Sequence, residues 1–405
     1  MKRHSKLIGG ILLVSGTTIG AAMLALPVST GAAGFFLSLL IFVLFWALMT
    51  YTAFLMLEVI LWDKYETNLI TIAKKTLGFW GQAITWFIYL FLLYALTTAY
   101  IAGSGPIVID FVYSLIGYRM PEWAGTIPLL LIFGFFVYKG TRSVDWANRL
   151  LMLGLVIAYV IMAVFLTPHV NFHLLSYTNW KEIWAGISVV ATSFGFHIII
   201  PSLSTYLDRD LHKLKKAILI GSLIPLAVYI FWEFLTLGII PLDGPNGIIQ
   251  GYLDGANGAH LLTAFLNNEA LAMVARFFSF FAIVTSFLGV SLSLSHFLAD
   301  GLKIKKTRSG RLLLYFLTFF PPLVFTLTDP RAFLSALEYA GAYGVVVLLA
   351  FLPALMVWAG RYYENLSSET AFRVPGGKPA LILVIVLSLV VVGIEIANNV
   401  GLLKF

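Results

Sequence analysis

Eleven long runs of uncharged apolar residues divide this chain, and they restrict it to one class of fold. A helix needs about 20 apolar residues to cross a hydrocarbon core of about 30 Å, and most of the runs are that long. Only 11% of the residues are charged, whereas soluble domains carry about 25%. The sequence therefore predicts an all-α polytopic membrane protein with a single transmembrane domain, residues 1–405. The expected spans are 7–29, 33–61, 80–104, 125–140, 147–167, 182–207, 215–240, 270–301, 309–327, 332–359 and 379–403.

The segments outside these spans carry their own signals. The basic start, Met1 to Lys6, precedes an apolar run with no clear cleavage site, so we expect a retained first helix and not a signal peptide. The stretch 67–77 is amphipathic and too short to span, which favours a position at the cytoplasmic interface. The loop 241–269 is rich in Gly and Asn and has no Lys or Arg. A short helix is expected within it at 259–268.

The positions of the basic residues predict the orientation. With the N-terminus inside, 21 of the 26 Lys and Arg residues fall on the inner side and five on the outer side. Basic residues collect in cytoplasmic loops, and a missed or invented span would scramble this split. The expectation is a bacterial inner-membrane protein with a cytoplasmic N-terminus and a periplasmic C-terminus.

Two of the expected spans contain a cluster of small residues near their middle. In the first span the cluster Ser15–Gly20 is followed by Pro27, and in the sixth the cluster Thr192–His197 is followed by Pro201. The two spans are five apart and therefore run in opposite directions, as in the two halves of an inverted repeat. We expect repeats at about 7–167 and 182–359, with 379–403 as an extra helix. Close packing of small residues between helices is the simpler alternative.

Broken helices at these positions suit a zwitterionic substrate. A half-helix N-terminus presents N–H groups and a partial positive charge to a carboxylate, and the backbone of Thr17 to Ala21 would supply it. A half-helix C-terminus presents carbonyl oxygens to an ammonium group, here near Ser193 and Phe194. No charged side chain is needed to bind an amino acid in this way.

The same stretches carry a family resemblance. The sequences GGILLVSGTTIGAAMLALP and TSFGFHIIIPSL, together with eleven spans, resemble the hydroxy/aromatic amino acid permease family, and within it the tyrosine and tryptophan permeases. The resemblance covers nearly the whole chain. It implies a 5+5 inverted repeat of the LeuT type with helices 1 and 6 broken, one extra C-terminal helix, and inward symport driven by protons. It also implies a substrate site at the two breaks.

The expected substrate contacts come from both breaks and from aromatic residues near the midplane. The aromatic candidates, two of them within the sixth-span break, would form an apolar pocket for a ring, although any buried bundle contains such residues. The full set is Gly16, Thr17, Thr18, Ile19, Gly20, Ala21, Ser193, Phe194, Gly195, Phe196, His197, Tyr94 and Phe281.

Ionisable residues at membrane depth are candidates for ion coupling. His197 titrates near neutral pH, and a neutral structural histidine is an equally good interpretation. Glu338 would act as an outer gate or proton carrier, or simply pair with Arg331. Glu233 and Glu395 are also deep within spans. Thr285 and Ser286 in span eight match the Ser/Thr pair that binds sodium in sodium-coupled relatives, although packing between helices is the favoured interpretation.

The chain has no cysteine, no phosphate-binding loop and no H-E-x-x-H sequence, so we expect no cofactor, no metal site and no ATP hydrolysis. The expected partners are a small amino acid and the lipid bilayer, with no nucleic acid and no obligate protein partner. The leading hypothesis is a symporter, not an enzyme, that imports aromatic amino acids, tyrosine first among them. Alternatives are a carrier of a small hydroxy-amino acid such as serine, sodium coupling, an intramembrane enzyme, or a channel or sensor.

Overall fold

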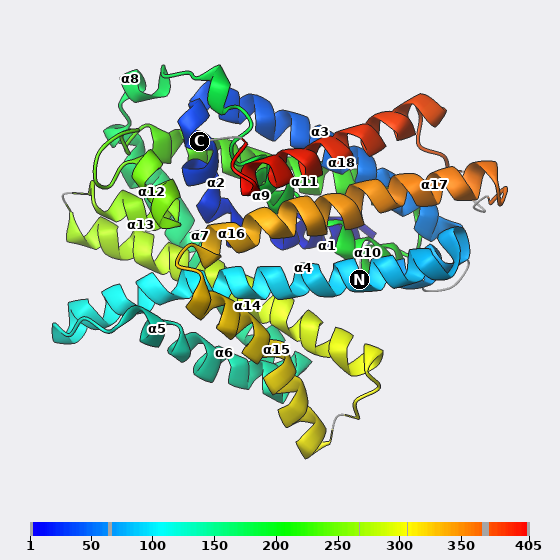
Figure 1. Ribbon diagram of the computed structural model, residues 1–405, viewed down its shortest axis with the longest axis horizontal. Helices are drawn as coiled ribbons and strands as arrows, with labels where there is room; N and C mark the ends of the chain where they lie inside the picture. The colour runs from blue at the N-terminus through cyan, green and yellow to red at the C-terminus, as the bar shows by residue number, and fades with distance from the viewer. Residues whose placement is uncertain (1–2, 64–66, 267, 306, 367–371, 403–405) are drawn as a thin grey trace.

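The computed structural model describes residues 3–63, 67–266, 268–305, 307–366 and 372–402. Within these residues the chain is built of helices that lie mostly along the long axis of the molecule (Figure 1). Ten are long and apolar enough to cross a membrane, and α1 and α2 together form an eleventh span with a 53° bend at its break. The prediction of an all-α protein with eleven spans is confirmed.

The first five spans occupy the N-terminal part of the chain. Their helices are α1 (Arg3–Thr18), α2 (Ala22–Thr30), α3 (Phe35–Leu61), α4 (Leu69–Ile116), α5 (Glu122–Gly125), α6 (Ile127–Lys139) and α7 (Thr141–Leu166). The amphipathic segment forms the start of α4 and is separated from the third span by a kink at Gly78 (φ 70°, ψ −160°). The α4 helix continues to Ile116, well past the expected end at residue 104, because Pro106 is accommodated inside the membrane helix.

The second five spans and the extra helix follow a stretch of short helices, α8 (Phe172–Leu175) among them. They are α9 (Ile187–Ser193), η4 (His197–Ile199) with α10 (Ile200–Tyr206), α11 (Leu211–Leu237), α14 (Glu269–Gly301), α15 (Arg308–Thr328), α16 (Ala332–Tyr339) with α17 (Leu352–Tyr362), and α18 (Gly377–Asn399). The π-helical segments Ala340–Val345 and Val347–Phe351 join α16 to α17. The loop between α11 and α14 contains α12 (Ile248–Asp254) and α13 (Gly258–Thr263), and the latter overlaps the first half of the expected helix 259–268.

Side chains from distant segments meet at one end of the bundle, which we call the basic face. Lys6 forms an ion pair with Asp208 at 2.6 Å, and Lys75 forms one with Asp63 at 2.5 Å. Asp210 caps α11 by accepting a hydrogen bond from the Lys213 N–H, and hydrogen bonding to Lys213 lowers the pKa of this carboxyl. The helices α8, α12 and α13 lie at the other end, the opposite face (Figure 1).

A buried ion pair ties three segments together near the basic face. The Arg361 guanidinium in α17 donates to both oxygens of Glu58 in α3, at 2.7 and 2.5 Å. The Val374 N–H donates to Glu58 at 2.7 Å, and Arg361 donates to the Val374 carbonyl at 2.8 Å. The Glu58 and Arg361 side chains are 0% and 6% exposed.

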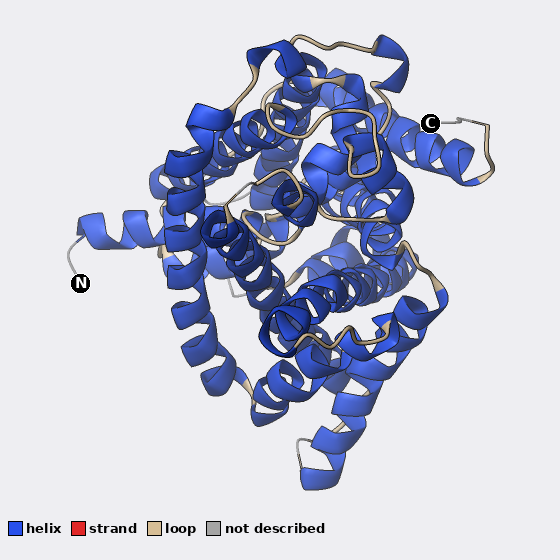
Figure 2. Cartoon of the chain, turned by 90° about the vertical axis from the view of Figure 1, so that its left-hand side faces the viewer, coloured by secondary structure: helices blue, strands red, loops and turns tan. Residues whose placement is uncertain are grey.

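The two halves of the first span differ in their surroundings. All nine residues of α2 are buried, whereas Ile8 and Leu12 in α1 are more than half exposed. The start of α1 projects sideways from the bundle when the molecule is viewed along its long axis (Figure 2). The bundle is therefore packed tightly around α2, on the side of the break towards the opposite face, and more loosely around α1, on the side towards the basic face.

Candidate functional site

The first span is broken over Ile19, Gly20 and Ala21. The Ile19 N–H still bonds to the Ser15 carbonyl at 2.9 Å, as in a helix. The Ala21 N–H instead donates to the Ser286 hydroxyl of α14 at 2.9 Å. The new helix begins at Ala22, so an amide of the break is bonded to a side chain that a ligand oxygen can replace. The predicted break in the first span is confirmed.

The sixth span is broken over Phe194, Gly195 and Phe196. The helix α9 ends at Ser193, and the Gly195 N–H turns back to the Thr192 carbonyl at 3.1 Å. The Phe196 N–H donates to the Phe194 carbonyl at 3.1 Å, which forms a tight turn before the chain continues into η4. The second predicted break is confirmed, and each break spans three residues.

A single tyrosine joins the two breaks. The Tyr229 hydroxyl of α11 lies 2.6 Å from the Thr18 carbonyl oxygen and 2.9 Å from the Ser193 carbonyl oxygen. These are the carbonyls at the ends of the two half-helices, where the helix dipole concentrates negative charge. The hydroxyl has one proton to share between two acceptors. This point of the structure thus has an excess of acceptor oxygens, which suits a cationic donor such as an ammonium group.

The other side of the first break is lined by hydroxyl groups. Ser286 accepts the hydrogen bond from Ala21, and the Tyr100 hydroxyl of α4 lies near it. A Cβ atom placed on Gly20 would lie 2.5 Å from the Ser286 Oγ, so the close approach of α14 requires glycine there. Hydroxyl and amide donors therefore gather at the first break, where an anionic carboxylate would bind.

The remaining residues of the two clusters have local partners. The hydroxyls of Thr17, Thr18 and Ser193 donate to carbonyls four residues earlier in their own helices. Gly16 lies close to Met152 of α7. Ile19 and Gly20 are half-buried, and Thr17 is exposed. The break in the first span is thus accessible from the side on which α1 is loosely packed.

Among the expected aromatic contacts, only those of the sixth span lie at the breaks. Phe194 is fully buried, and its ring meets the Tyr229 ring edge-on at 5.3 Å. Phe196 is fully buried as well. Tyr94 lies elsewhere, because its hydroxyl donates to the Leu317 carbonyl of α15. Phe281 packs against Gly154 of α7 and stacks on Phe277.

The contacts of Tyr94 and Phe281 therefore lie on α15, α7 and α14, and their expected role in binding substrate stays a prediction. Tyr100, six residues after Tyr94 on α4, lies near Ser286. Sequence analysis missed Tyr100 and Tyr229. Each places a hydroxyl in the middle of an apolar span, and that was the available signal.

The candidates for ion coupling lie at separate places. His197 is fully buried, and its Nε2 lies 2.9 Å from the Thr52 hydroxyl of α3. Of the expected pair in α14, Ser286 contacts the first break, whereas Thr285 donates to carbonyls of its own helix. Among the described residues, no group of three or more His, Asp or Glu side chains is arranged to hold a metal ion.

Glu338 takes part in a contact that closes the opposite face. Tyr252 of α12 donates its hydroxyl to Glu338 at 3.1 Å, and the Arg331 guanidinium lies 4.8 Å from the centre of its ring. Burial raises the pKa of Tyr252 to about 12, so the phenol keeps its proton. The loop helix α12 is thereby held against the start of the tenth span. Glu395 of α18 accepts a hydrogen bond from Ser188 of α9 at 2.6 Å.

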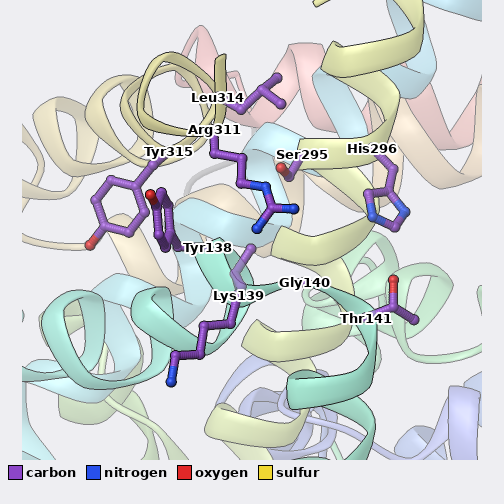
Figure 3. Close-up of a pocket in the computed structure, with 10 residues that line it drawn as sticks. Tyr138, Lys139, Gly140, Thr141, Ser295, His296, Arg311, Leu314 and Tyr315 are labelled. Carbon is purple, nitrogen blue, oxygen red and sulfur yellow. The ribbon is translucent and has the colours of Figure 1, made fainter. Parts of the chain in front are cut away.

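A separate cavity of about 260 Å³ lies where α6 meets α14 and α15. Arg311 reaches into the space between Tyr138 and His296, whereas Lys139 points away from it (Figure 3). None of the residues expected to bind substrate lines this cavity. It is therefore distinct from the site at the breaks.

Eleven spans, of which the first and sixth are broken and joined by one hydroxyl, define a transporter fold of the LeuT type. Solved structures agree on the fold. A crystal structure of the Eremococcus coleocola manganese transporter with an aromatic bis-isothiourea substituted compound has a TM-score of 0.58 and 14% identity, over 98% of this chain and 87% of that chain. A mutant form of that transporter gives a TM-score of 0.63 over 97% and 87%.

Sequence comparison identifies the family. Residues 3–395 match the tryptophan/tyrosine permease family, and the chain belongs to it. It is 36% identical to the tyrosine-specific transport system 1 of Haemophilus influenzae, over 99% of both chains. It is 31% identical to the tryptophan-specific transport protein of Pseudomonas aeruginosa, over 95% of this chain and 92% of that one. A glutamine transporter 2 of Aliivibrio fischeri is 30% identical over 93% and 95%. These relatives are named as transporters, so the chain is a permease and not an enzyme.

Proposed function

We infer that this chain imports aromatic amino acids, with tyrosine as the preferred substrate, by proton symport across the bacterial inner membrane. The observation that carries the proposal is the meeting of both half-helix ends at Tyr229. The substrate ammonium group binds the carbonyl oxygens of Thr18 and Ser193. The carboxylate replaces Ser286 at the Ala21 N–H and faces the positive end of α2.

The side chain of the substrate lies against the sixth-span break in this scheme. Phe194 supplies a fully buried ring there, and stacking of aromatic rings adds about 0.5–1.5 kcal/mol beyond burial. The relatives named for tyrosine and tryptophan transport support an aromatic substrate. The two repeats, about 7–167 and 182–359, would rock against each other around the fixed site, with the basic face in the cytoplasm.

The test is uptake of radiolabelled tyrosine, tryptophan, phenylalanine and serine into proteoliposomes, with and without an inward proton gradient. We expect saturable uptake of tyrosine that the gradient stimulates. A sodium gradient is imposed next if protons have no effect. Stimulation by sodium alone would assign the coupling to sodium, and no accumulation with either ion would contradict symport.

Replacing Tyr229 with phenylalanine will test the carbonyl pair directly. The variant keeps the ring packed on Phe194 but removes a side-chain donor that Thr18 and Ser193 share. Leaving two buried carbonyl acceptors without a donor costs about 1–3 kcal/mol of free energy. We therefore expect the substrate affinity to change and the initial rate of uptake to fall about 10-fold. Initial rates over a range of substrate concentrations measure the effect.

Tyr159→Phe is the matched control. Tyr159 lies on α7, and its hydroxyl donates to the carbonyl of Val228 on α11 at 3.0 Å, away from the breaks. This variant loses a tyrosine donor to α11 without touching the site, and its uptake should stay near the wild-type rate. Equal losses in the two variants would argue against a special role for Tyr229.

A further inference from the structure

Glu233 is a fully buried carboxyl group on α11, one helical turn beyond Tyr229. Its Oε1 lies 2.7 Å from the Thr30 hydroxyl at the end of α2. Its Oε2 has no hydrogen-bond partner within the described part of the chain. A buried carboxylate without a cation is costly, and an ionisable residue at membrane depth is a functional candidate.

The hydroxyl groups around Glu233 have fewer protons than there are hydrogen-bond acceptors, so one additional proton is needed. The Thr30 hydroxyl has a single proton, and it also lies 2.9 Å from the Leu26 carbonyl oxygen. Ser38, another hydroxyl close to Glu233, lies 3.2 and 3.0 Å from the carbonyls of Thr30 and Gly34. Each hydroxyl thus has more acceptors than protons. A proton on Glu233 lets the carboxyl donate to Thr30 while Thr30 donates to Leu26.

No basic side chain neutralises Glu233 in the structure as described. No ion pair joins it to any helix packed against α11, because the charged groups on those helices are occupied or distant. The ion pairs on those helices are Lys6 of α1 with Asp208, Glu58 of α3 with Arg361, His260 of α13 with Asp110, Arg276 of α14 with Glu269 and Arg149 of α7 with Asp145. The helix α2 carries no charged residue. His173 of α8 lines a surface cavity.

That cavity offers a route for protons from the opposite face. It has a volume of about 480 Å³ and is lined by Gly31, which follows Thr30, by Gly34, whose carbonyl accepts from Ser38, and by Leu237, one turn further along α11. His173 and Asp243 also line it. The carboxyl therefore lies about one helical turn below a polar opening on the side from which an imported substrate would arrive.

We propose that Glu233 is the binding site of the transported proton, an inference that rests on the proton symport proposed above. Its two connections lead to the substrate site. Through Thr30 it contacts α2, which begins at the first break, and along α11 it is preceded by one turn by Tyr229, which contacts both breaks. Binding of a proton there tightens the contact between α2 and α11, and loss of the proton loosens it.

The test separates exchange from accumulation in proteoliposomes containing Glu233→Gln. Glutamine has the size of a protonated glutamate and donates a hydrogen bond, but it cannot release a proton. We expect exchange of external for internal tyrosine to continue within about twofold of wild type, while stimulation by an inward proton gradient falls to about onefold. Glu233→Asp keeps a carboxyl group and should retain part of the stimulation.

Two further variants serve as comparisons. Glu269→Gln changes a carboxyl whose side chain is 76% exposed and should behave as wild type. Glu338→Gln removes the rival carboxyl and should retain gradient stimulation. Stimulation that persists in Glu233→Gln, or is lost only in Glu338→Gln, would overturn the inference while leaving proton symport intact. A wild-type protein without stimulation would overturn the proposed coupling as well.

If Glu233→Gln does not exchange substrate, infrared difference spectroscopy on the wild type and on Glu233→Asp decides the question. A carboxyl-stretch band that appears on acidification and shifts in the aspartate variant supports a proton on residue 233. The same band at an unchanged position in both proteins contradicts it.

Discussion

Replacing Arg361 with methionine will destabilise the protein by about 3–5 kcal/mol, the cost of removing one partner from a buried ion pair. Glu58 would then remain buried, with the Val374 N–H still bonded to it but without its cationic partner. The pair joins α3, α17 and the segment before α18, so its loss should loosen the basic face. The midpoint of thermal unfolding, followed by size-exclusion chromatography of the detergent-solubilised protein, measures the effect.

Two controls distinguish this effect from a general loss of charge. The double variant Glu58→Leu with Arg361→Met removes both charges and should recover most of the stability, because a buried pair is often replaceable by apolar residues. Lys75→Met breaks a pair whose side chains are 40% and 26% exposed, and it should cost less than about 1 kcal/mol. An Arg361→Met variant as stable as Lys75→Met would show that the buried pair contributes little.

Replacing Gly20 with valine will abolish transport while leaving the protein folded. A Cβ at this position lies 2.5 Å from the Ser286 Oγ, so the hydroxyl must leave the Ala21 N–H or α14 must move. Overpacking of this kind costs about 1–3 kcal/mol, and here it falls on the amide that would receive the carboxylate. We expect tyrosine uptake to fall about 100-fold, which corresponds to about 2.7 kcal/mol.

The matched control is Gly289→Val in α14, the helix that carries Ser286. A Cβ on Gly289 meets no atom within 4 Å, so the added side chain has room. This variant should transport at close to the wild-type rate. Wild-type uptake by Gly20→Val would mean that the first break does not bind the substrate.

The spans and both breaks were predictable because the hydrocarbon core imposes strong rules on composition. Charge is excluded from a span, and a helix breaks only where its freed backbone groups are satisfied. The small-residue clusters with trailing prolines, Pro27 and Pro201, therefore marked the breaks. The end of α4 was misplaced because a proline such as Pro106 terminates soluble helices more reliably than membrane helices.

The side chains around the breaks were harder to predict, because they depend on how each helix is rotated. Tyr94 and Tyr100 are six residues apart, which places them about 240° apart around α4. The sequence offers both tyrosines, and only the packing of α4 against α14 selects Tyr100. The π-helical segments of the tenth span likewise have no compositional signal, since they arise from packing around residues 340–351.

The backbone character of the two breaks has a consequence for how this family diversifies. In the proposed site, the groups that would face the amino and carboxyl ends of a substrate are the Thr18 and Ser193 carbonyls and the Ala21 amide. Main-chain atoms persist through almost any substitution that preserves local shape. Mutations can then change the surrounding side chains and so the substrate specificity. The backbone contacts to the amino and carboxyl groups, which all amino acids share, stay the same. Relatives named for tyrosine, tryptophan and glutamine are the outcome expected of such a division.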